Sequence, residues 1–395
     1  MTGDPRPIGR RVAYLRVRRG LSQQSLADRL GKSKSWVDKV ERGVRSLERV
    51  STIREIAVVL RVDAATLLGR DAQPVEVAER SEGVARIRAA LSTYEMALGR
   101  PSARLKVMPP DRLAREVGHA WATYQHARYP HLVELVPTLL TEAHRTHARY
   151  PAGRALVVEA YRVTAALLVK LDEANLAWLA ADRAMSAATG DRTALACAAV
   201  QLGQVLRASA RARSVMLTAA YQIAPPDLDA GTPQELSLCG SLLVQAALIA
   251  ARCGNDRTTA DLLDEAAEMA ARVGDGHDHH RTAFGPTAVE LARVTAAVEL
   301  GDGPEALARH EKAIGRDGWQ WLPVEHRAAH LVDAARAYLQ SDDAANAARL
   351  LMQTDSLAPA EVRHRPAVRE VIAQVAREPD APAMITQLAI ALGLV

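Results

Sequence analysis

The feature that most constrains the fold is an alternation of amphipathic helices and short breaks that begins near Asp111. Apolar residues recur at helical spacing within each segment. One Phe, abundant Ala and Leu and few strand signals favour helices packed through small residues. We therefore predict an all-α fold. The predicted helix pairs are 111–128 with 131–149, 154–170 with 173–188, 193–208 with 211–224, 234–252 with 256–273, 286–300 with 303–314, and 324–340 with 342–353.

The turns within these pairs recur at irregular intervals. They lie near Asp172, Ser209, Gly254, Gly301 and Ser341, which are 37, 45, 47 and 40 residues apart. The pattern resembles tetratricopeptide-type repeats, whose period is roughly 34 residues, so the repeats here are degenerate or carry insertions. HEAT-like stacking is the alternative. The resemblance implies a tetratricopeptide-like right-handed helical solenoid over 111–395, ending in capping helices at 361–377 and 382–394.

A second pattern occupies residues 21–43. Ser22 precedes a short periodic segment that ends at Gly31, and Ser33 precedes another that ends at Gly43. This predicts two short helices joined by a tight turn, the arrangement that fits a duplex groove. The expected buried residues are Leu26, Leu30, Val37 and Val40, and the expected open face of the second helix carries Lys34, Ser35, Trp36, Asp38, Lys39 and Arg42.

The stretch from Ile8 to Gly69 resembles the helix-turn-helix domain of Xre/Cro/CI-type repressors. Its second helix opens with Leu-Ser-Gln at 21–23, and its third closes with Val-Glu-Arg-Gly at 40–43. That resemblance implies a five-helix DNA-binding domain over residues 1–70. The remaining helices are expected at 8–19, at 51–61 and, as a short fifth one, from Asp63.

The resemblance also implies roles for single residues. In that family the residue matching Gln23 binds phosphate, and those matching Lys34 and Lys39 approach base edges, as does the one matching Ser35. In the same family an arginine at the position of Arg16 commonly pairs with an acidic residue at the position of Glu41. Trp36 departs from the small residue usual at its position and either packs against the DNA or braces the helix. The expected DNA-binding residues are Gln23, Ser33, Lys34, Ser35, Trp36, Lys39, Arg42 and Arg45.

Charge is segregated along the chain. Residues 1–70 hold 16 Lys and Arg against 7 Asp and Glu, which leaves 34 against 39 of the total 50 and 46 for the remainder. A basic segment attracts phosphate regardless of sequence, and the acidic remainder does not. The alternative to a DNA-binding domain is an inert helical hairpin whose charged side chains are only solvated.

Residues 71–110 are expected to be a linker that contains a helix. Asp71 to Pro74 mark a boundary, and a helix from about Ser81 to Leu98 is a candidate linking or dimerisation element. Three prolines follow in 99–110, which predicts a loop. Residues 1–7 are expected to form a flexible arm.

The first helix of each pair is expected to line the concave side of the solenoid. Four polar residues recur there about once per repeat within apolar runs and are the candidate ligand-binding residues: Arg162, Gln201, Gln245 and Arg293. Their amides and guanidinium groups suit a peptide backbone. The alternative is that each side chain is merely solvated at the helix surface.

The run His277-Asp-His-His280 contains side chains that suit a transition metal, but it lies between repeats without a fourth ligand at fixed spacing. We expect a solvated loop and no metal or cofactor.

Cys197, Cys239 and Cys253 are expected to be small buried residues. Phosphate-binding, nucleophile-elbow and zinc-protease motifs are absent, so an enzyme is not expected. The absence of a signal region and of a long apolar run predicts a cytoplasmic protein with no membrane partner.

These patterns favour a sequence-specific transcriptional regulator that binds double-stranded DNA as a homodimer on an inverted repeat. Its repeat domain would serve sensing and dimerisation. Bacterial regulators that join the two domain types resemble this arrangement, and many respond to short signalling peptides, as in quorum sensing. The ligand would be a peptide or small molecule. The alternative function is a DNA-tethered adaptor whose repeat domain docks a protein partner.

Overall fold

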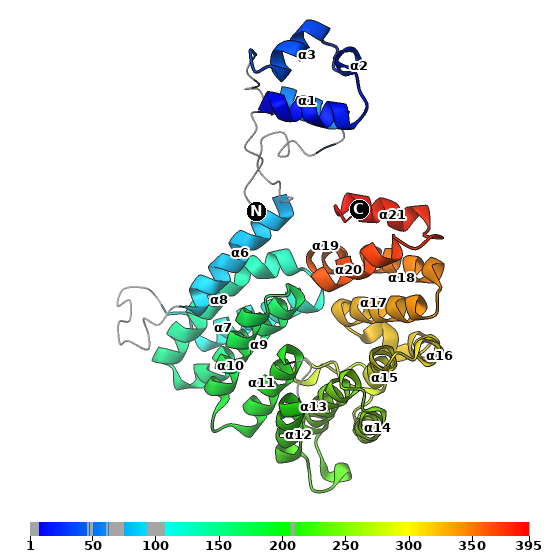
Figure 1. Ribbon diagram of the computed structural model, residues 1–395. Coiled ribbons are helices and arrows are strands. Elements are labelled where there is room, and N and C mark those ends of the chain that lie inside the picture. The colour runs from blue at the N-terminus through cyan, green and yellow to red at the C-terminus, as the bar shows by residue number, and fades with distance from the viewer. Residues whose placement is uncertain are drawn as a thin grey trace. The chain divides into compact units, whose positions relative to one another are not determined.

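The computed structural model describes residues 8–45, 47, 50–60, 62, 75–92, 107–206 and 210–394. Within these ranges the chain consists of helices joined by turns and loops, with no strand, which confirms the predicted all-α fold with a helical-repeat region (Figure 1). Contacts between Cα atoms divide the chain into two compact units, Met1–Glu82 and Gly83–Val395, which we call the N-terminal unit and the array.

Four described helices of the N-terminal unit surround one small core. Val12, Leu26, Val37 and Ile56 are nearly inaccessible to solvent and meet at its centre, together with Leu60. The flexible arm expected at 1–7 and the fifth helix expected from Asp63 lie outside the described residues. The helices are α1 (Ile8–Arg18), α2 (Gln23–Arg29), α3 (Lys34–Glu41) and α4 (Val50–Leu60).

Helix α6 (Val75–Leu91) begins six residues before the helix expected at about Ser81. Val84, Ile87 and Leu91 recur at helical spacing and are buried in the first core of the array. The expected continuation from 93 to 98 lies outside the described residues. From Gly83 onward α6 is therefore part of the array.

The array is a series of helix pairs whose bounds lie close to the predicted ones. Several breaks depend on a residue in the left-handed region, including Asp172 (φ 58°) and Gly254 (φ 70°), which ends one helix before the next begins. The helices are α7 (Pro110–Gln125), α8 (Tyr129–Arg149), α9 (Arg154–Lys170), α10 (Ala174–Ala188), α11 (Arg192–Val205), α12 (Ala210–Ile223), α13 (Pro233–Arg252), α14 (Asp256–Val273), α15 (Pro286–Leu300), α16 (Gly303–Ile314), α17 (Val324–Gln340), α18 (Ala344–Leu357), α19 (Pro359–His364), α20 (Pro366–Val375) and α21 (Ala383–Ala391).

The capping helix predicted at 361–377 is wrong in one respect, because the chain forms two helices there. Helix α19 ends at His364 and α20 begins at Pro366, which has no N–H to continue the ladder of α19. The break allows Arg365 to turn toward the inside of the array, where it lines a pocket described below.

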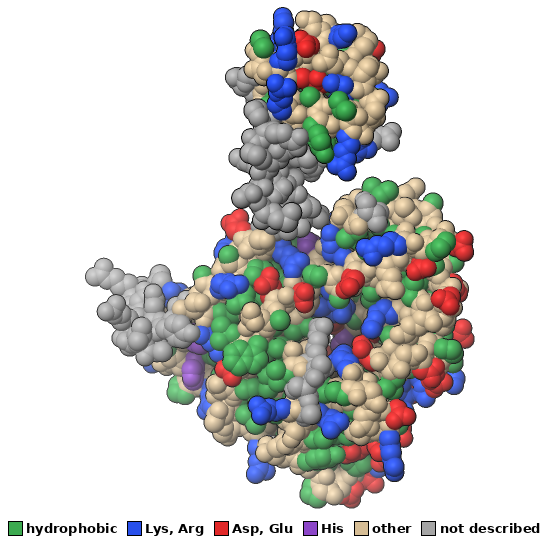
Figure 2. All heavy atoms as spheres, in the orientation of Figure 1, with side chains coloured by type: hydrophobic (Ala, Val, Ile, Leu, Met, Phe, Trp, Pro, Cys, Tyr) green, Lys and Arg blue, Asp and Glu red, His purple; other side chains and the backbone are tan. Residues whose placement is uncertain are grey.

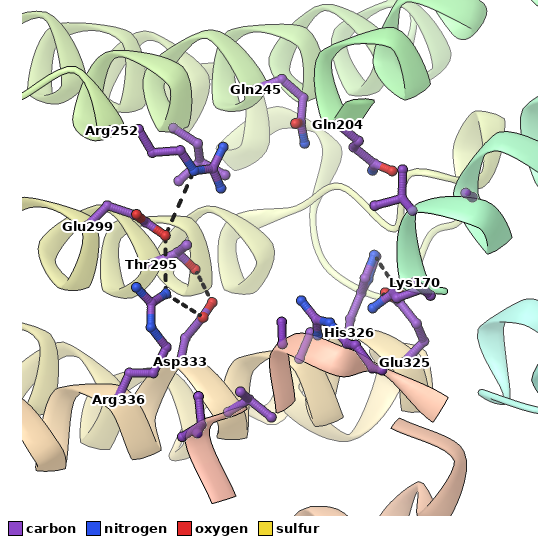
Figure 3. Close-up of a pocket in the computed structure, with 18 of the residues that line it drawn as sticks. Lys170, Gln204, Gln245, Arg252, Thr295, Glu299, Glu325, His326, Asp333 and Arg336 are labelled. Atoms are coloured by element: carbon purple, nitrogen blue, oxygen red, sulfur yellow. Dashed lines mark hydrogen bonds and ion pairs between the residues drawn. The ribbon is translucent and has the colours of Figure 1, made fainter. Parts of the chain in front are cut away.

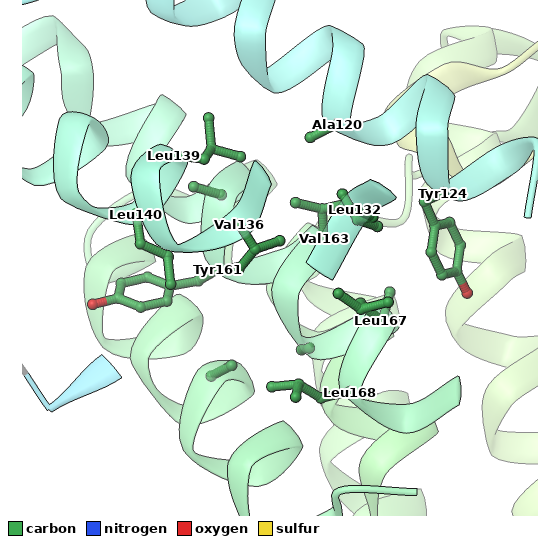
Figure 4. Packing of buried hydrophobic residues seen from close by; sticks show 14 of the residues in the cluster. Ala120, Tyr124, Leu132, Val136, Leu139, Leu140, Tyr161, Val163, Leu167 and Leu168 are labelled. Carbon is green, nitrogen blue, oxygen red and sulfur yellow. The ribbon is translucent and has the colours of Figure 1, made fainter. Parts of the chain in front are cut away.

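Alanine lets neighbouring helices approach closely in the array core. Ala177, Ala180 and Ala184 recur along one face of α10 and are fully buried against α9. Figure 4 shows the larger side chains that fill the space between α7, α8 and α9, among them Val136 and Leu167. Small residues on one helix and branched ones on its neighbour together give native packing density.

Helix α13 is, within the described ranges, the single helix that is long and apolar enough to cross a membrane. However, 72% of its most apolar window is buried inside the array. It packs between α12 and α14, so its apolar composition is explained by its central place in the array.

The array curls until its last helices meet its first ones. Helix α17 contacts α7, and α19 contacts α8, although about two hundred residues separate them in sequence (Figure 1). Tyr124 at the end of α7 donates a hydrogen bond of 3.3 Å to Glu325 of α17, and Tyr129 of α8 donates one to Glu361 of α19. The sequence pattern did not predict this closure.

A buried group of charges, which we call the clasp, holds the closure. Its members are Lys170, Glu325, Glu361 and Arg365, with the two tyrosines just described. The Lys170 Nζ lies 2.5 Å from Glu325 Oε1 and 2.9 Å from Glu361 Oε1, and Arg365 Nη1 lies 3.1 Å from Glu361 Oε2. Burial alone would raise the pKa of Glu361, but Lys170 and Arg365 outweigh it and lower this pKa from 4.5 to about 2.

Lys170→Met should destabilise the array by roughly 3–5 kcal/mol at pH 7, because it leaves two carboxylates buried near each other with less compensation. The folded pKa of Glu361 lies below its ordinary value of 4.5, so its stabilising effect is present above that pH and is lost as the pH falls toward 2. The loss caused by the variant should therefore be smaller at pH 4 than at pH 7. Urea denaturation followed by circular dichroism at both pH values measures it.

Arg272→Ala is the matched control, because Arg272 makes an exposed 2.7 Å ion pair with Asp229 and should contribute less than about 1 kcal/mol. Equal losses for the two variants would contradict the assigned role of the clasp.

Candidate functional site

Two serine caps mark the starts of α2 and α3. Ser22 Oγ accepts a hydrogen bond of 3.0 Å from the backbone N–H of Ser25, and Ser33 Oγ accepts one of 3.1 Å from that of Trp36. Between the helices Gly31 adopts a φ of 62°, a conformation that favours glycine. Both caps predicted from the sequence are therefore present, and they set where each helix begins.

Helix α3 presents a cationic face. Lys34, Ser35 and Lys39 are exposed, whereas Val37 and Val40 on its other side are buried. Figure 2 shows that Lys and Arg outnumber Asp and Glu on the visible face of this unit. Arg42 is also exposed but makes an ion pair of 2.8 Å with Asp38, so part of its charge is compensated.

Trp36 is half-buried and packs against the core of the N-terminal unit. The guanidinium carbon of Arg45 lies 6.0 Å from the centre of its ring, within the range of a cation–π interaction. Of the two readings left open for Trp36, bracing of the helix is therefore supported by the packing. The stacking also gives Arg45 a defined place next to α3.

Glu41 connects three segments at the end of α3. Its carboxylate accepts hydrogen bonds from Arg16 Nε (2.6 Å) and Arg16 Nη2 (2.9 Å), and from Gln23 Nε2 (2.8 Å). Arg16 Nη1 also donates to the carbonyl of Leu21 at 2.8 Å. The Arg16–Glu41 pair implied by the resemblance is thus present, and one amide hydrogen of Gln23 is already used within the protein.

Close backbone contact completes this framework. A Cβ atom at Gly9 of α1 would lie 2.0 Å from the carbonyl oxygen of Val40, so only glycine fits at this crossing of α1 and α3. The orientation of α3 is consequently fixed by a backbone contact and by the hydrogen bonds of Glu41.

A separate pocket of about 780 Å³, which we call the hollow, lies inside the array. Its lining residues come from the first helix of each pair, from α20, and from Arg281 and Arg365 in the segments between α-helices. Among the described residues, the second helices of the pairs (α8, α10, α12, α14, α16 and α18) contribute none. The hollow is therefore the concave side of the helical array, as the repeat pattern predicts. Its volume is in the range of small-molecule sites.

Most charges that face the hollow are paired across helices (Figure 3). Arg336 Nη1 lies 3.1 Å from Glu299 Oε1 and 3.5 Å from Asp333 Oδ1. Thr295 donates a hydrogen bond of 2.9 Å to the other oxygen of Asp333, and Arg252 approaches Glu299 to 3.8 Å. Because these charges already have partners, the hollow offers little net charge to a ligand.

Amide side chains also face the hollow. Gln204 of α11 and Gln245 of α13 project into it (Figure 3), and Gln374 of α20 also lines it. In the described part of the chain, the amides of Gln245 and Gln374 have no hydrogen-bond partner. These groups both donate and accept hydrogen bonds, which suits a neutral polar ligand.

The four candidate ligand residues occupy different environments. Gln201 and Gln245 line the hollow. Arg162 is fully buried behind it, where its Nε donates to Gln201 Oε1 at 2.8 Å and its guanidinium carbon lies 5.3 Å from the Trp121 ring. Arg293 does not line the hollow and pairs instead with Asp264 of α14 at 2.7 Å.

The histidine-rich loop between α14 and α15 folds inward. The carbonyl of His280 accepts a hydrogen bond of 2.9 Å from Arg162, and Gln125 of α7 donates one of 2.8 Å to Asp278. The expectation of a solvated loop is wrong for His280, because its ring lies 3.5 Å from the buried Cys197 Sγ. The described residues contain no group of three metal-ligating side chains arranged to hold a metal.

The expectation for the cysteines is wrong at one position. Cys197 and Cys239 are buried, and burial raises the pKa of the Cys239 thiol to about 12, but Cys253 is exposed. Cys253 directly follows the last residue of α13, at the turn where the helix leaves the core. Burial was expected from the apolar periodicity of the helix, and this periodicity does not apply to Cys253, which lies just outside α13.

A family model described as a helix-turn-helix domain matches residues 7–68. The N-terminal unit contains a helix-turn-helix DNA-binding domain. The match covers the two capped helices, the turn between them and the Arg16–Glu41–Gln23 framework. No curated protein and no solved structure is detectably similar to the chain.

Lys34→Ala and Lys39→Ala in the full-length protein should each weaken binding to a specific site by about 1–3 kcal/mol, provided that the side chain contacts a base. Arg45→Ala should reduce affinity for specific and random duplexes alike, because a phosphate contact carries no sequence information. Titration of labelled duplexes at several salt concentrations measures both effects. Equal losses on specific and random DNA for Lys34→Ala would exclude base contact by Lys34.

Glu41→Ala should destabilise the helix-turn-helix domain by roughly 3 kcal/mol, because Arg16 then keeps a largely buried charge without its carboxylate. Asp38→Ala, which breaks the exposed pair with Arg42, is the control and should cost less than about 0.5 kcal/mol. Hydrogen exchange measured by mass spectrometry on the intact chain resolves α1–α3 from the array. Unchanged protection in Glu41→Ala would refute the contribution of this pair.

Proposed function

We propose that the chain is a transcriptional regulator that recognises a specific operator through α3 and responds to a ligand bound in the hollow. The helix-turn-helix domain supplies the DNA-binding activity, and the role of a regulator accounts for it better than that of an enzyme. Lys34, Ser35 and Lys39 are proposed to contact bases. Gln23, Ser33, Trp36, Arg42 and Arg45 are proposed to contact the DNA backbone or to position α3.

The proposed protein acts in the bacterial cytoplasm as a homodimer on an inverted repeat. One small domain offers few base contacts, and a second half-site about one helical turn away adds affinity. The array is proposed to be tetratricopeptide-like and to carry the dimerisation surface. Analytical ultracentrifugation with and without operator tests this, and a monomer bound tightly to a single half-site would contradict it.

The observation that carries the sensing proposal is the chemistry of the hollow. The paired charges and the amides of Gln245 and Gln374 fit a small neutral ligand or a short peptide with many hydrogen-bonding groups. Because the clasp joins the first and last helices of the array, the hollow is bounded by helices from both ends of the array. Lys170, Glu325 and Arg365 of the clasp line it. A ligand that touches α9 and α17 together favours the closed array over a more open one.

The second candidate function, a DNA-tethered adaptor, is favoured by the last helix of the array. Met384 and Ile390 of α21 are 51% and 60% exposed, although Ile385 and Ala389 on its other face are buried. An adaptor would bind a protein partner and be insensitive to small molecules. The following experiment separates the two functions.

Genomic fragments bound by the full-length protein should be selected with and without the low-molecular-weight fraction of a cell extract. We expect the fraction to change operator affinity at least tenfold, which is 1.4 kcal/mol of coupling. Gln245→Ala should retain operator binding and lose the response, because the amide lines the hollow inside the array. The control is Arg272→Ala on the outer helix α14, which should respond normally. An unresponsive wild-type protein would favour the adaptor.

A further inference from the structure

A smaller cavity of about 190 Å³ adjoins the hollow between α11, α13, α15 and α17. The two share residues at their boundary, including Gln204 and Gln245. Polar and apolar side chains both line the smaller cavity, and the apolar ones come from α11, α13, α15, α17 and the loops that precede α15 and α17. Its apolar residues include Val200, Val244, Phe284, Leu291 and Leu322.

Phe284 is the one phenylalanine of the chain, and its ring packs against a glycine of the neighbouring helix α13. A Cβ atom at Gly240 of α13 would lie 2.1 Å from Cζ of the ring, so glycine is required at this contact. Phe284 itself is 3% exposed. The ring therefore forms a fixed wall of the cavity.

The loop that carries Phe284 is held in an unusual backbone conformation. His280, Arg281 and Ala283 have φ values of 52°, 62° and 45°, in the left-handed region that residues other than glycine seldom adopt. Asp278 fixes the loop by accepting the N–H of Ala283 at 3.1 Å, and Arg162 fixes it by donating to the His280 carbonyl. Strain of this kind persists when surrounding contacts impose it and is concentrated at binding sites.

Charged groups around the cavity already have partners. Arg281 lies 3.4 Å from Asp278, and Asp333 accepts from Thr295 and approaches Arg336. His330 is 3% exposed, shares a hydrogen bond of 2.8 Å with His310 and is neutral, because burial lowers its pKa to about 3. A charged ligand group placed here would be desolvated without a counter-ion.

We propose that this cavity is a subsite for one uncharged apolar group, a branched aliphatic chain or a single aromatic ring, on a ligand whose neutral amides or hydroxyls reach Gln204 and Gln245. The inference rests on the proposed sensing role of the hollow and adds the chemical class of the ligand. The apolar part of the wall favours burial of the apolar group, and the amides of Gln204 and Gln245, which line both cavities, orient the polar part.

The test uses full-length protein and three defined probes at millimolar concentration: N-acetyl-leucinamide, N-acetyl-phenylalaninamide and N-acetylglycinamide. Saturation-transfer NMR should show the leucine methyl or phenylalanine ring protons in closest contact, and the glycine probe should give at least fivefold weaker signals. Equal signals from all three probes would overturn the proposal.

Ala288→Phe fills the cavity from α15 and should abolish the signals. Ala345→Phe, at an exposed position of α18, is the matched control and should leave them unchanged. A photoreactive diazirine analogue of N-acetyl-leucinamide supplies evidence that does not depend on a variant. Its cross-links should map by mass spectrometry to α13 and to residues 284–292, and cross-links confined to other helices would refute the subsite.

The outcome is separable from that of the proposed function. Probe binding that leaves operator affinity unchanged in every extract fraction would remove the sensing role and keep the cavity as a binding site. An extract-dependent change in operator affinity without probe binding would remove only the subsite.

Discussion

The clasp is the interaction on which the form of the array depends. Lys170 lies between carboxylates from α17 and α19, and each carboxylate also accepts a phenol hydroxyl from α7 or α8. Taking these charges out of water is costly, and the cost is offset only when every member is present. The same contacts close the helical array, so the hollow is bounded by both ends of the array. An open array would present a groove instead.

The two units handle charge in opposite ways. The helix-turn-helix domain leaves Lys34 and Lys39 exposed and uses its buried carboxylate, Glu41, to hold α1 and the start of α2 against α3. The array pairs most of its inward-facing charges with one another. The first arrangement suits a polyanion such as DNA, and the second suits a neutral ligand.

The inner surface of the array was only partly predictable. The resemblance to a solenoid of helix pairs implied that the first helix of each pair faces inward, and Gln201 and Gln245 on these helices line the hollow. It did not indicate that Arg162 lies behind Gln201, that Arg293 pairs with α14, or that the loop at His280 crosses to α9. Each of these contacts joins segments 29 to 118 residues apart, and local spacing carries no information about such pairs.

The sequence by itself determined the helices, their serine caps at Ser22 and Ser33, the core of the helix-turn-helix domain and the pairing of helices in the array. These features follow from interactions within a few residues, where side-chain period and capping chemistry act directly. Only the tertiary structure decided the closure through Lys170 and Glu361, the place of the loop that carries Phe284, and the exposure of Cys253. The reason is that small rotations between successive helix pairs accumulate along the array, and their sum depends on how every pair packs.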